Sequence, residues 1–476
     1  MNLESILSAK GANYTSLLIT SGKEPFKTPL DKLLREYDPN YHKVMDKLYR
    51  KDKKVKNKTN KKDIDGNPIY EVKTSKVCRT PIPMQRVLVE RSVGFIFGIP
   101  VSYNCSDLNG EQQKEIYNKF QKIIKDNKMQ YTDKNIARRL FSEREVAELW
   151  YFVLDNNGKP TNEMRCKILS PTLGDGLYPH FDEYGRMDAF ARSYTTRSEY
   201  ELDKTISHFD IYTNEYVYSL TDEEGKMTWD GHKRKHGFTK IPIGYYRQEE
   251  AEWECVQPVI ERIEDLLSNW GDINDYFGAP SYFCKGNLTG FADKGEQGRV
   301  YTGQGDADMR VLSWDSSPQS MSTELATLTN IVFSYTQTPD ISFETMKQLG
   351  GQTSGVAIKL MFTDPHMKAD VKIELFGNIL QRRVNIILNG IVSQIFPTYK
   401  SVLEDFTIEP QFTPYQPKND KEILDLIQAS TGGVATLSQE EGVKLNPLVT
   451  NPEKVLSELK EQAEEEKKNN GQSLDN

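Results

Sequence analysis

The chain contains 476 residues, of which 37% are hydrophobic and 27% charged, and its mean hydropathy is −0.63. At ~100–200 residues per domain, this length predicts two to four structural units. The 24 Tyr, 20 Phe and 5 Trp argue against bulk disorder. The longest apolar run, Val93–Tyr103, is too short to cross a membrane, and Met1–Glu4 lacks a signal-peptide pattern. We therefore expect neither a membrane protein nor a secreted one.

The charge balance is acidic, with 61 Lys and Arg against 69 Asp and Glu, a formal net charge of −8. Proteins that hold nucleic acid tightly are usually basic, because Lys and Arg displace the counterions of the phosphates. We therefore expect any contact with nucleic acid to be loose. The five cysteines are scattered singly, so neither a disulfide framework nor a zinc ribbon is predicted, and we interpret them as incidental thiols.

The first eighty residues begin with a helical, moderately apolar part and continue into a lysine-rich stretch, Lys43–Lys62. This stretch is poor in apolar residues, which predicts a mobile surface segment. Asp63–Pro68 lacks the later ligands and the closing Glu of a calcium loop. We interpret it as a turn into a strand at Ile69–Val72.

Helices and short strands are mixed between residues 84 and 250. The apolar spacing predicts helices at Met84–Phe97, Gly110–Met129 and Lys134–Trp150. Strands are predicted at Leu149–Leu154, Cys166–Leu169, Ala189–Tyr194, His208–Thr213 and Glu215–Leu220, with a hairpin turn at Asn156-Asn157-Gly158. We expect a small antiparallel sheet decorated with helices.

The second half is more helical. Amphipathic helices are predicted at Glu252–Tyr276 and Ser322–Tyr335, and the glycine-rich connection Gly278–Asp315 between them holds strand candidates at Pro280–Cys284 and Met309–Ser313. Val356–Phe396 is typical of one very long helix that Pro365 kinks; alternatively a helix ends there and Met367–Phe396 is separate. A strand pattern follows at Phe406–Tyr415, then helices from Asn419 into a frayed tail, Glu464–Asn476.

Several patterns suggest catalysis or metal binding, but each is incomplete. Gly350–Gly355 opens a helix, yet Val356-Ala357 stand where a phosphate loop needs Lys and Ser or Thr. Gly303–Asp308 lacks the third glycine of a dinucleotide site. His232 and His236 have zinc-like spacing, but the cations around them favour a solvated turn. The pair Asp306 and Asp308 is a weak signal for a magnesium-dependent nuclease.

Several motifs follow one another in a fixed order. Arg91–Val101 leads from a helix to a strand through Gly98-Ile99-Pro100-Val101, and Glu148–Phe152 precedes the hairpin. Thr338–Glu344 is followed by Gly351–Lys359, which contains Ser354-Gly355-Val356-Ala357-Ile358-Lys359. In this order the motifs resemble those of portal proteins of tailed double-stranded DNA bacteriophages, of the long-tailed-phage type. The likeness runs from about Met84 to about Lys468, whereas the lysine-rich part matches poorly and Gly278–Asp315 matches only in position and size.

This resemblance implies an α+β, multi-domain portal fold: a wing of mixed helix and sheet, a two-helix stem, a small α/β clip, a long kinked helix and a helical crown. The implied boundaries are 1–250 for the N-terminal segment and wing, 251–277 and 317–335 for the stem helices, 278–316 for the clip, 336–354 for a tunnel loop, 355–416 for the long helix and wing return, and 417–476 for the crown with a flexible tail.

The resemblance also implies that the tunnel loop reaches toward DNA in an axial channel. Its polar residues are Ser342, Thr345, Lys347, Gln348 and Gln352; its hinges are Pro339, Gly350, Gly351 and Gly355; and Pro365 would kink the long helix. Twelve copies at −8 each would carry −96 formal charges, so most of the wall should repel phosphate. A sparse ring of Lys347 would then permit sliding. The alternative for Lys347 is an ordinary solvent-facing lysine.

The function implied is a ring, usually of twelve copies, at one capsid vertex: the channel for genome packaging and ejection, without catalysis, cofactor or metal of its own. Its expected partners are other copies of itself, the terminase large subunit, a head–tail connector or adaptor, the major capsid and scaffolding proteins, and double-stranded DNA. We expect it in the virion after assembly in the bacterial host cytoplasm. The alternatives are a metal-dependent phage nuclease and another head–tail connector or minor capsid protein.

Overall fold

The computed structural model describes residues 18, 23–62, 64–66, 68–105, 108, 110–197, 205–223, 226–277, 281–289, 302–312, 318–338, 362–415, 420–432, 435–449 and 451–471. The chain divides into two compact units. The first comprises Met1–Thr338 and Lys368–Pro414, and the second comprises Pro339–Met367 and Tyr415–Asn476. The chain combines helices with antiparallel strands, so the predicted α+β class is confirmed.

The second half of the lysine-rich stretch forms one strand of a β-ribbon. After helix α2 (Leu30–Tyr37) and two short 3₁₀ turns, strand β1 (Lys53–Lys62) pairs antiparallel with β2 (Pro68–Ser75). The predicted strand at Ile69–Val72 is therefore confirmed. Lys43–Lys62, predicted as a mobile surface segment, contains a 3₁₀ turn at Lys43–Met45 and the strand β1, and its mobility stays a prediction. The lysines stand on a strand whose hydrogen-bond partner, β2, carries β-branched and aromatic residues.

Three helices follow the ribbon: α3 (Met84–Phe97), α4 (Glu111–Asp126) and α5 (Met129–Glu143). The first matches its prediction. The predicted helices Gly110–Met129 and Lys134–Trp150 have the wrong boundary, because Lys128 (φ 49°) separates α4 from α5 and Arg144 (φ 69°) ends α5. Left-handed backbone at a non-glycine residue is not encoded by apolar spacing. Strand β4 then begins at Glu145, inside the predicted helix.

Two antiparallel sheets, rather than one, occupy the middle of the first unit. The smaller has the order β11-β4-β5 and the larger the order β10-β9-β8-β7-β6. Their bounds are β4 Glu145–Leu154, β5 Pro160–Leu169, β6 Gly176–Phe181, β7 Met187–Arg197, β8 Thr205–Tyr212, β9 Tyr216–Glu223, β10 Lys226–Lys235 and β11 Ile243–Arg247. The hairpin at Gly158 (φ 74°) joins β4 to β5 as predicted.

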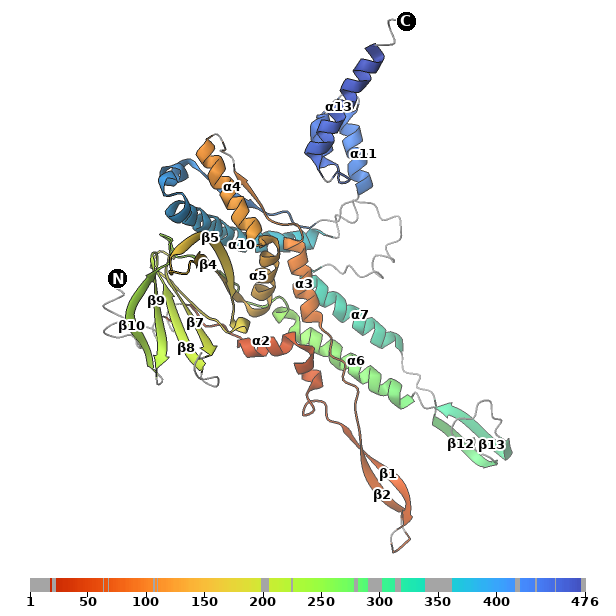
Figure 1. Cartoon of the computed structure of the whole chain (residues 1–476). Coiled ribbons are helices and arrows are strands. Elements are labelled where there is room, and N and C mark those ends of the chain that lie inside the picture. The colour runs from red at the N-terminus through yellow and green to blue at the C-terminus, as the bar shows by residue number, and fades with distance from the viewer. Residues whose placement is uncertain are drawn as a thin grey trace. The chain divides into compact units, whose positions relative to one another are not determined.

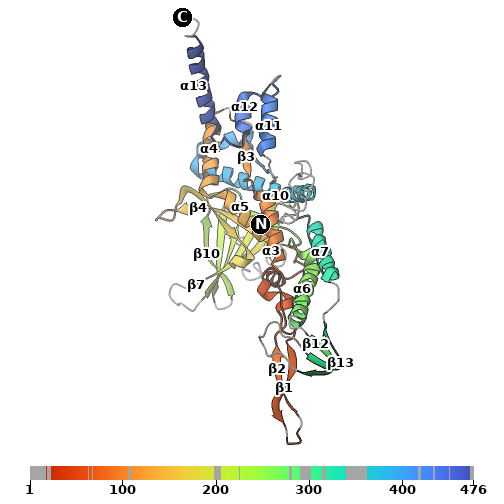
Figure 2. The same cartoon turned by 90° about the vertical axis from the view of Figure 1, so that its right-hand side faces the viewer.

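Two long helices lie side by side in both views (Figures 1 and 2). Helix α6 spans Gln257–Phe277, just after a 3₁₀ turn at Glu254–Val256, and α7 spans Pro318–Tyr335. Arg262 of α6 pairs with Glu324 of α7 at 2.7 Å. Between them in sequence, β12 (Ser281–Thr289) and β13 (Thr302–Leu312) pair antiparallel and overlap both predicted strands, Pro280–Cys284 and Met309–Ser313. The two predicted amphipathic helices are thus confirmed.

The chain returns to the main core through α10 (Thr363–Gly390), which continues as a π-helical turn at Ile391–Ile395. The described part of the predicted Val356–Phe396 helix therefore begins at Thr363, and residues 356–361 lie outside the described residues. After a 3₁₀ segment, β14 (Ile408–Gln411) pairs with β3 (Ser102–Cys105), within the strand predicted at Phe406–Tyr415.

The largest core cluster joins α3, α5, α6 and α10. The Phe97 and Phe376 rings meet edge to face with centroids 4.9 Å apart, and Trp253, in the same cluster, is fully buried. Phe376 also contacts Phe141 and Tyr246. Aromatic contacts of this kind bury large areas, so they fix α10 on the sheet-and-helix body.

The second unit contains α11 (Asp420–Thr431), α12 (Gln439–Leu445) and α13 (Pro452–Gly471). Ser438 caps α12 by accepting a hydrogen bond from the Glu441 backbone N–H. The predicted helical character is confirmed, and α13 extends to Gly471, so it includes the first part of the tail predicted to fray, Glu464–Gly471. Within the described parts of the chain, no helix is long and apolar enough to cross a membrane.

Candidate channel loop and the clamp at its base

Residues 339–361, which include all of the predicted tunnel loop except Thr336–Thr338, lie outside the described residues. This applies to Ser342, Thr345, Lys347, Gln348 and Gln352 and to the hinges Pro339, Gly350, Gly351 and Gly355, as well as to the glycine run that resembles a phosphate loop. The structure does describe both ends of this segment, Thr338 and Phe362. The roles of the loop residues therefore stay predictions, and the geometry of its base can be examined.

Helix α7 ends in a tightly bonded turn that leads into the loop. The Thr338 N–H donates to the Phe333 carbonyl at 3.0 Å, and the Gln337 N–H donates to Ser334 at 3.1 Å. Gln337 has φ 50°, so this is a Schellman ending with glutamine at the position that glycine usually takes. Thr336 and Thr338 are each only 5% exposed. The chain is thus held firmly up to the residue at which the loop begins.

Pro365 lies in the first turn of α10. Proline is tolerated there because the first N–H groups of a helix have no intrahelical acceptor. The predicted kink at Pro365 involves residues that fall outside the described part of the chain, and it stays a prediction.

A buried ion-pair cluster joins the two ends of the loop. Glu252, just before α6, accepts from Lys368 and Lys372 of α10, each at 2.5 Å. Lys368 also donates to the Thr336 carbonyl at 2.9 Å and to the Ser92 hydroxyl of α3 at 2.9 Å. We call these five residues the loop-base clamp. It connects the end of α7 to the second turn of α10.

The electrostatics of the clamp favour the ionised carboxylate. Burial alone would raise the pKa of Glu252, but the two ammonium groups of Lys368 and Lys372 outweigh burial, and the pKa lies below its ordinary value. Lys372 is further held by the Gln248 side-chain oxygen at 2.9 Å and lies 4.9 Å from the Phe141 ring centre. Two cations against one carboxylate leave the clamp with a formal excess of positive charge.

A second buried cluster holds α10 about three turns further along the helix. Arg383 is fully buried and pairs with Asp133 of α5 and Glu148 of β4, each at 2.7 Å. The hydroxyl groups of Tyr103 and Tyr246 accept from the same guanidinium at 3.2 Å. Burial opposes the charge on Arg383, but the two carboxylates raise its pKa well above the ordinary value. This cluster fixes the helix on which both lysines of the clamp stand.

The side chains considered for catalysis have structural partners. Asp308 of β13 pairs with Arg310 at 2.9 Å on the surface. His232 belongs to β10, so the prediction of a solvated turn around it is wrong, and His236 contacts the Thr213 carbonyl at 3.0 Å. Among the described residues, no group of three or more His, Cys, Asp or Glu side chains is placed to hold a metal ion.

Sequence reasoning did not find the clamp. Lys368 and Lys372 are one helical turn apart on α10, and such a pair on a helix that is otherwise apolar on that face is a signal of a buried carboxylate nearby. Glu252 was placed at the start of the predicted helix Glu252–Tyr276, where it has no obvious partner in sequence. Glu252 lies 116 positions before Lys368, so only the fold brings the carboxylate and the two lysines together.

The chain was compared with known proteins. The model of the family described as phage portal protein, SPP1 Gp6-like, matches residues 31–469. The portal protein of Bacillus phage SPP1 is 22% identical over 488 aligned residues, which cover 96% of this chain and 91% of that protein. The family match defines a class of viral structural proteins, the portals. The chain belongs to the SPP1 Gp6-like family of phage portal proteins.

Solved structures with some likeness come from gene transfer agent particles. One, the neck of an empty particle computed with C6 symmetry, is 13% identical, covers 77% of this chain and 89% of that chain, and has a TM-score of 0.41. Another, the virion of a native particle, is 11% identical over 93% of this chain and 99% of that chain, with a TM-score of 0.38.

Proposed function

We propose that the chain forms a ring at a capsid vertex that serves as the channel for DNA packaging and ejection. The family match over residues 31–469 carries this proposal. In the same proposal the ring resides in the virion after assembly in the host cytoplasm. It offers a platform to the terminase large subunit, to a head–tail connector and to capsid and scaffolding proteins, and it has no catalysis or cofactor of its own.

In this proposal α6 and α7 form the stem, the β12–β13 hairpin the clip and α11–α13 the crown. The loop-base clamp supports a movable tunnel loop between α7 and α10. A cluster that ties Thr336 to Lys368 fixes the two ends of the segment, so the segment can change conformation without unfolding its flanking helices. Lys347 is then the single cation that the loop presents to DNA.

Electron microscopy of the purified full-length protein tests the proposal. We expect ring-shaped particles with a central hole, in which the paired helices α6 and α7 surround the axis. A compact, solitary particle without a hole would overturn it. A ring whose axis is not surrounded by α6 and α7 would support the alternative of another head–tail connector.

The nuclease alternative is tested on the same preparation. It requires magnesium-dependent cleavage of DNA, and Asp308, one of the two carboxylates considered for it, is engaged by Arg310. We expect no cleavage with or without magnesium. Cleavage that disappears in Asp308→Asn would support the alternative.

A further inference from the structure

The β1–β2 ribbon has no role in the function proposed above, although it is rich in lysine. Residues 53–75 contain seven lysines against three acidic residues, a formal net charge of +4 in a chain whose total is −8. The ribbon projects away from the rest of the first unit in both views (Figures 1 and 2). The described residues on β1 and β2 are exposed at nearly every position.

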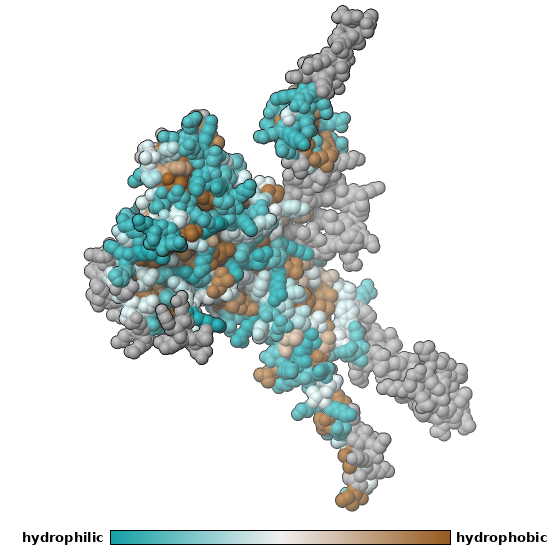
Figure 3. Space-filling view, in the orientation of Figure 1, coloured by the Kyte–Doolittle hydropathy of each residue, from teal (hydrophilic) through white to brown (hydrophobic). Residues whose placement is uncertain are grey.

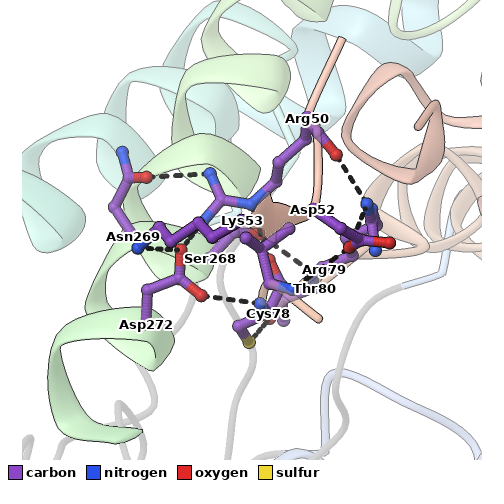
Figure 4. A network of polar contacts seen from close by, with 10 residues as sticks. Arg50, Asp52, Lys53, Cys78, Arg79, Thr80, Ser268, Asn269 and Asp272 are labelled. Carbon is purple, nitrogen blue, oxygen red and sulfur yellow. Dashed lines mark hydrogen bonds and ion pairs between the residues drawn. The ribbon is translucent and has the colours of Figure 1, made fainter. Parts of the chain in front are cut away.

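The ribbon is fixed at its root. Arg50, before β1, donates to Asn269 at 2.8 Å and to Asp272 at 2.7 Å, both on α6, and to the Cys78 carbonyl after β2 at 2.6 Å (Figure 4). The Cys78 N–H donates to the other oxygen of Asp272 at 2.7 Å. Arg50 before β1 and Cys78 after β2 are thereby both bonded to α6, at the base of the ribbon.

A second contact closes the root across the two strands. Arg79 donates to Asp52 at 2.8 Å and to the Arg50 carbonyl at 2.5 Å (Figure 4). The hydrogen bond from Arg79 lowers the pKa of the Asp52 carboxyl. Gly271 of α6 leaves room for Cys78, since a Cβ there would lie 2.4 Å from the thiol sulfur. The root of the ribbon is therefore held by hydrogen bonds and ion pairs both between its two ends and to α6.

The two faces of the ribbon differ in charge. The register places Lys54, Lys56 and Lys58 opposite Thr74, Val72 and Tyr70, so these six positions share one face. We call this the lysine face; it carries no acidic residue. On the other face Glu71 lies 3.7 Å from Lys73, and Asp272 lies 3.7 Å from Lys53. Within the described part of the chain, no ion pair involves Lys54 or Lys56.

The geometry of the lysine face suits a phosphate backbone. Alternate residues of a strand are about 6.6 Å apart, close to the roughly 6.8 Å rise of two base pairs in B-form DNA. A two-stranded ribbon also fits the major groove of B-form DNA. Lysine is depleted at protein–protein interfaces, whereas it provides sequence-independent contacts to phosphates. On the face that Figure 3 shows, the coloured residues of the ribbon include both hydrophilic and hydrophobic ones.

We propose that the lysine face of the β1–β2 ribbon binds the phosphate backbone of double-stranded DNA without sequence preference. The positive charge that attracts DNA is confined to the ribbon, so the proposal is compatible with the net negative charge of the whole chain. It is also independent of the tunnel loop, so a failure of either proposal leaves the other standing.

Fluorescence anisotropy with a labelled random-sequence duplex tests this inference on the full-length protein. The variant Lys54→Glu/Lys56→Glu/Lys58→Glu should bind DNA roughly 10-fold or more weakly, and the slope of log affinity against log salt should become shallower by roughly three. The conservative variant Lys54→Arg/Lys56→Arg/Lys58→Arg should retain binding. Particle size by electron microscopy and the unfolding temperature establish that each variant is folded.

A matched control carries the same change of charge on α4, as Lys114→Glu/Lys122→Glu/Lys125→Glu, where all three residues are exposed. Equal loss in the control and the ribbon variant would overturn the proposal, because general repulsion would then explain both. Unchanged DNA binding in the ribbon variant would overturn it as well. If the ribbon variant loses only the binding of poly-L-glutamate and keeps that of DNA, the occupant is an acidic protein surface and the DNA proposal is wrong.

Discussion

Glu252 and Arg383 are charges that folding removes from water and then surrounds with opposite charge. Glu252 is 7% exposed and receives two ammonium groups, and Arg383 is fully buried between two carboxylates. A buried pair of this kind gains little over an apolar packing, but removing one partner leaves an uncompensated charge, which is costly. The clamp and the Arg383 cluster therefore specify where α10 lies more than they add to total stability.

The substitution Glu252→Gln should destabilise the first unit by about 3–5 kcal/mol, because Lys368 and Lys372 would lose their only carboxylate in the clamp. The difference in the free energy of unfolding between the wild type and this variant should depend on pH. Since the folded-state pKa of Glu252 lies below the ordinary 4.5, its contribution is fully present above pH 4.5 and is lost as the pH falls through the folded-state pKa. Chemical denaturation of both proteins between pH 7 and pH 3 measures this.

The control for this experiment is Glu249→Gln. Glu249 is three residues away, its side chain is 76% exposed, and it pairs with Arg247 at 3.5 Å. The control should change stability by less than about 0.5 kcal/mol. A gap between wild type and Glu252→Gln that stays constant down to pH 3 would show that the carboxylate charge is not what stabilises the clamp.

At the scale of elements, single residues with left-handed backbone conformation decide where helices α4 and α5 end. Arg144 ends α5 in a left-handed conformation while its guanidinium stacks 4.2 Å from the Phe26 ring and donates to the Thr28 carbonyl. Sequence reasoning extended this helix to Trp150, since β4 is apolar and has no glycine or proline before it. The burial of Arg144 against Phe26 is a tertiary contact, and it overrides the local pattern.

The end of α7 offers a test of the same effect. Gln337→Gly should stabilise the protein by about 0.5–1 kcal/mol, because glycine adopts φ 50° without a steric cost. The matched control Ala326→Gly, at an exposed position within α7, should cost about 1 kcal/mol. Thermal or denaturant unfolding measures both. Destabilisation by Gln337→Gly would mean that the glutamine side chain makes a contact worth more than the backbone strain.

At the scale of the whole molecule, a ring of acidic chains would repel DNA over most of its wall. In that case the replacement Lys347→Glu should alter DNA packaging or retention and leave ring assembly normal, because it reverses the one cation of the proposed loop. The measurements are the DNA content of particles assembled with the variant and electron microscopy of the isolated rings. Lys400→Glu, at an exposed position of the first unit, is the control. Normal packaging with normal rings would count against a role for Lys347.

The sequence by itself determined several of the elements and the family of this protein. Periodic apolar spacing defined α3, α6 and α7, turn residues defined the β4–β5 hairpin, and ordered motifs indicated a portal. These signals are local in the chain, so they are readable without the fold. Only the tertiary structure decided that the lysine-rich stretch is a rooted ribbon and that Glu252 meets Lys368. Such contacts join residues far apart in sequence, and no local pattern records which distant partner will neutralise a charge.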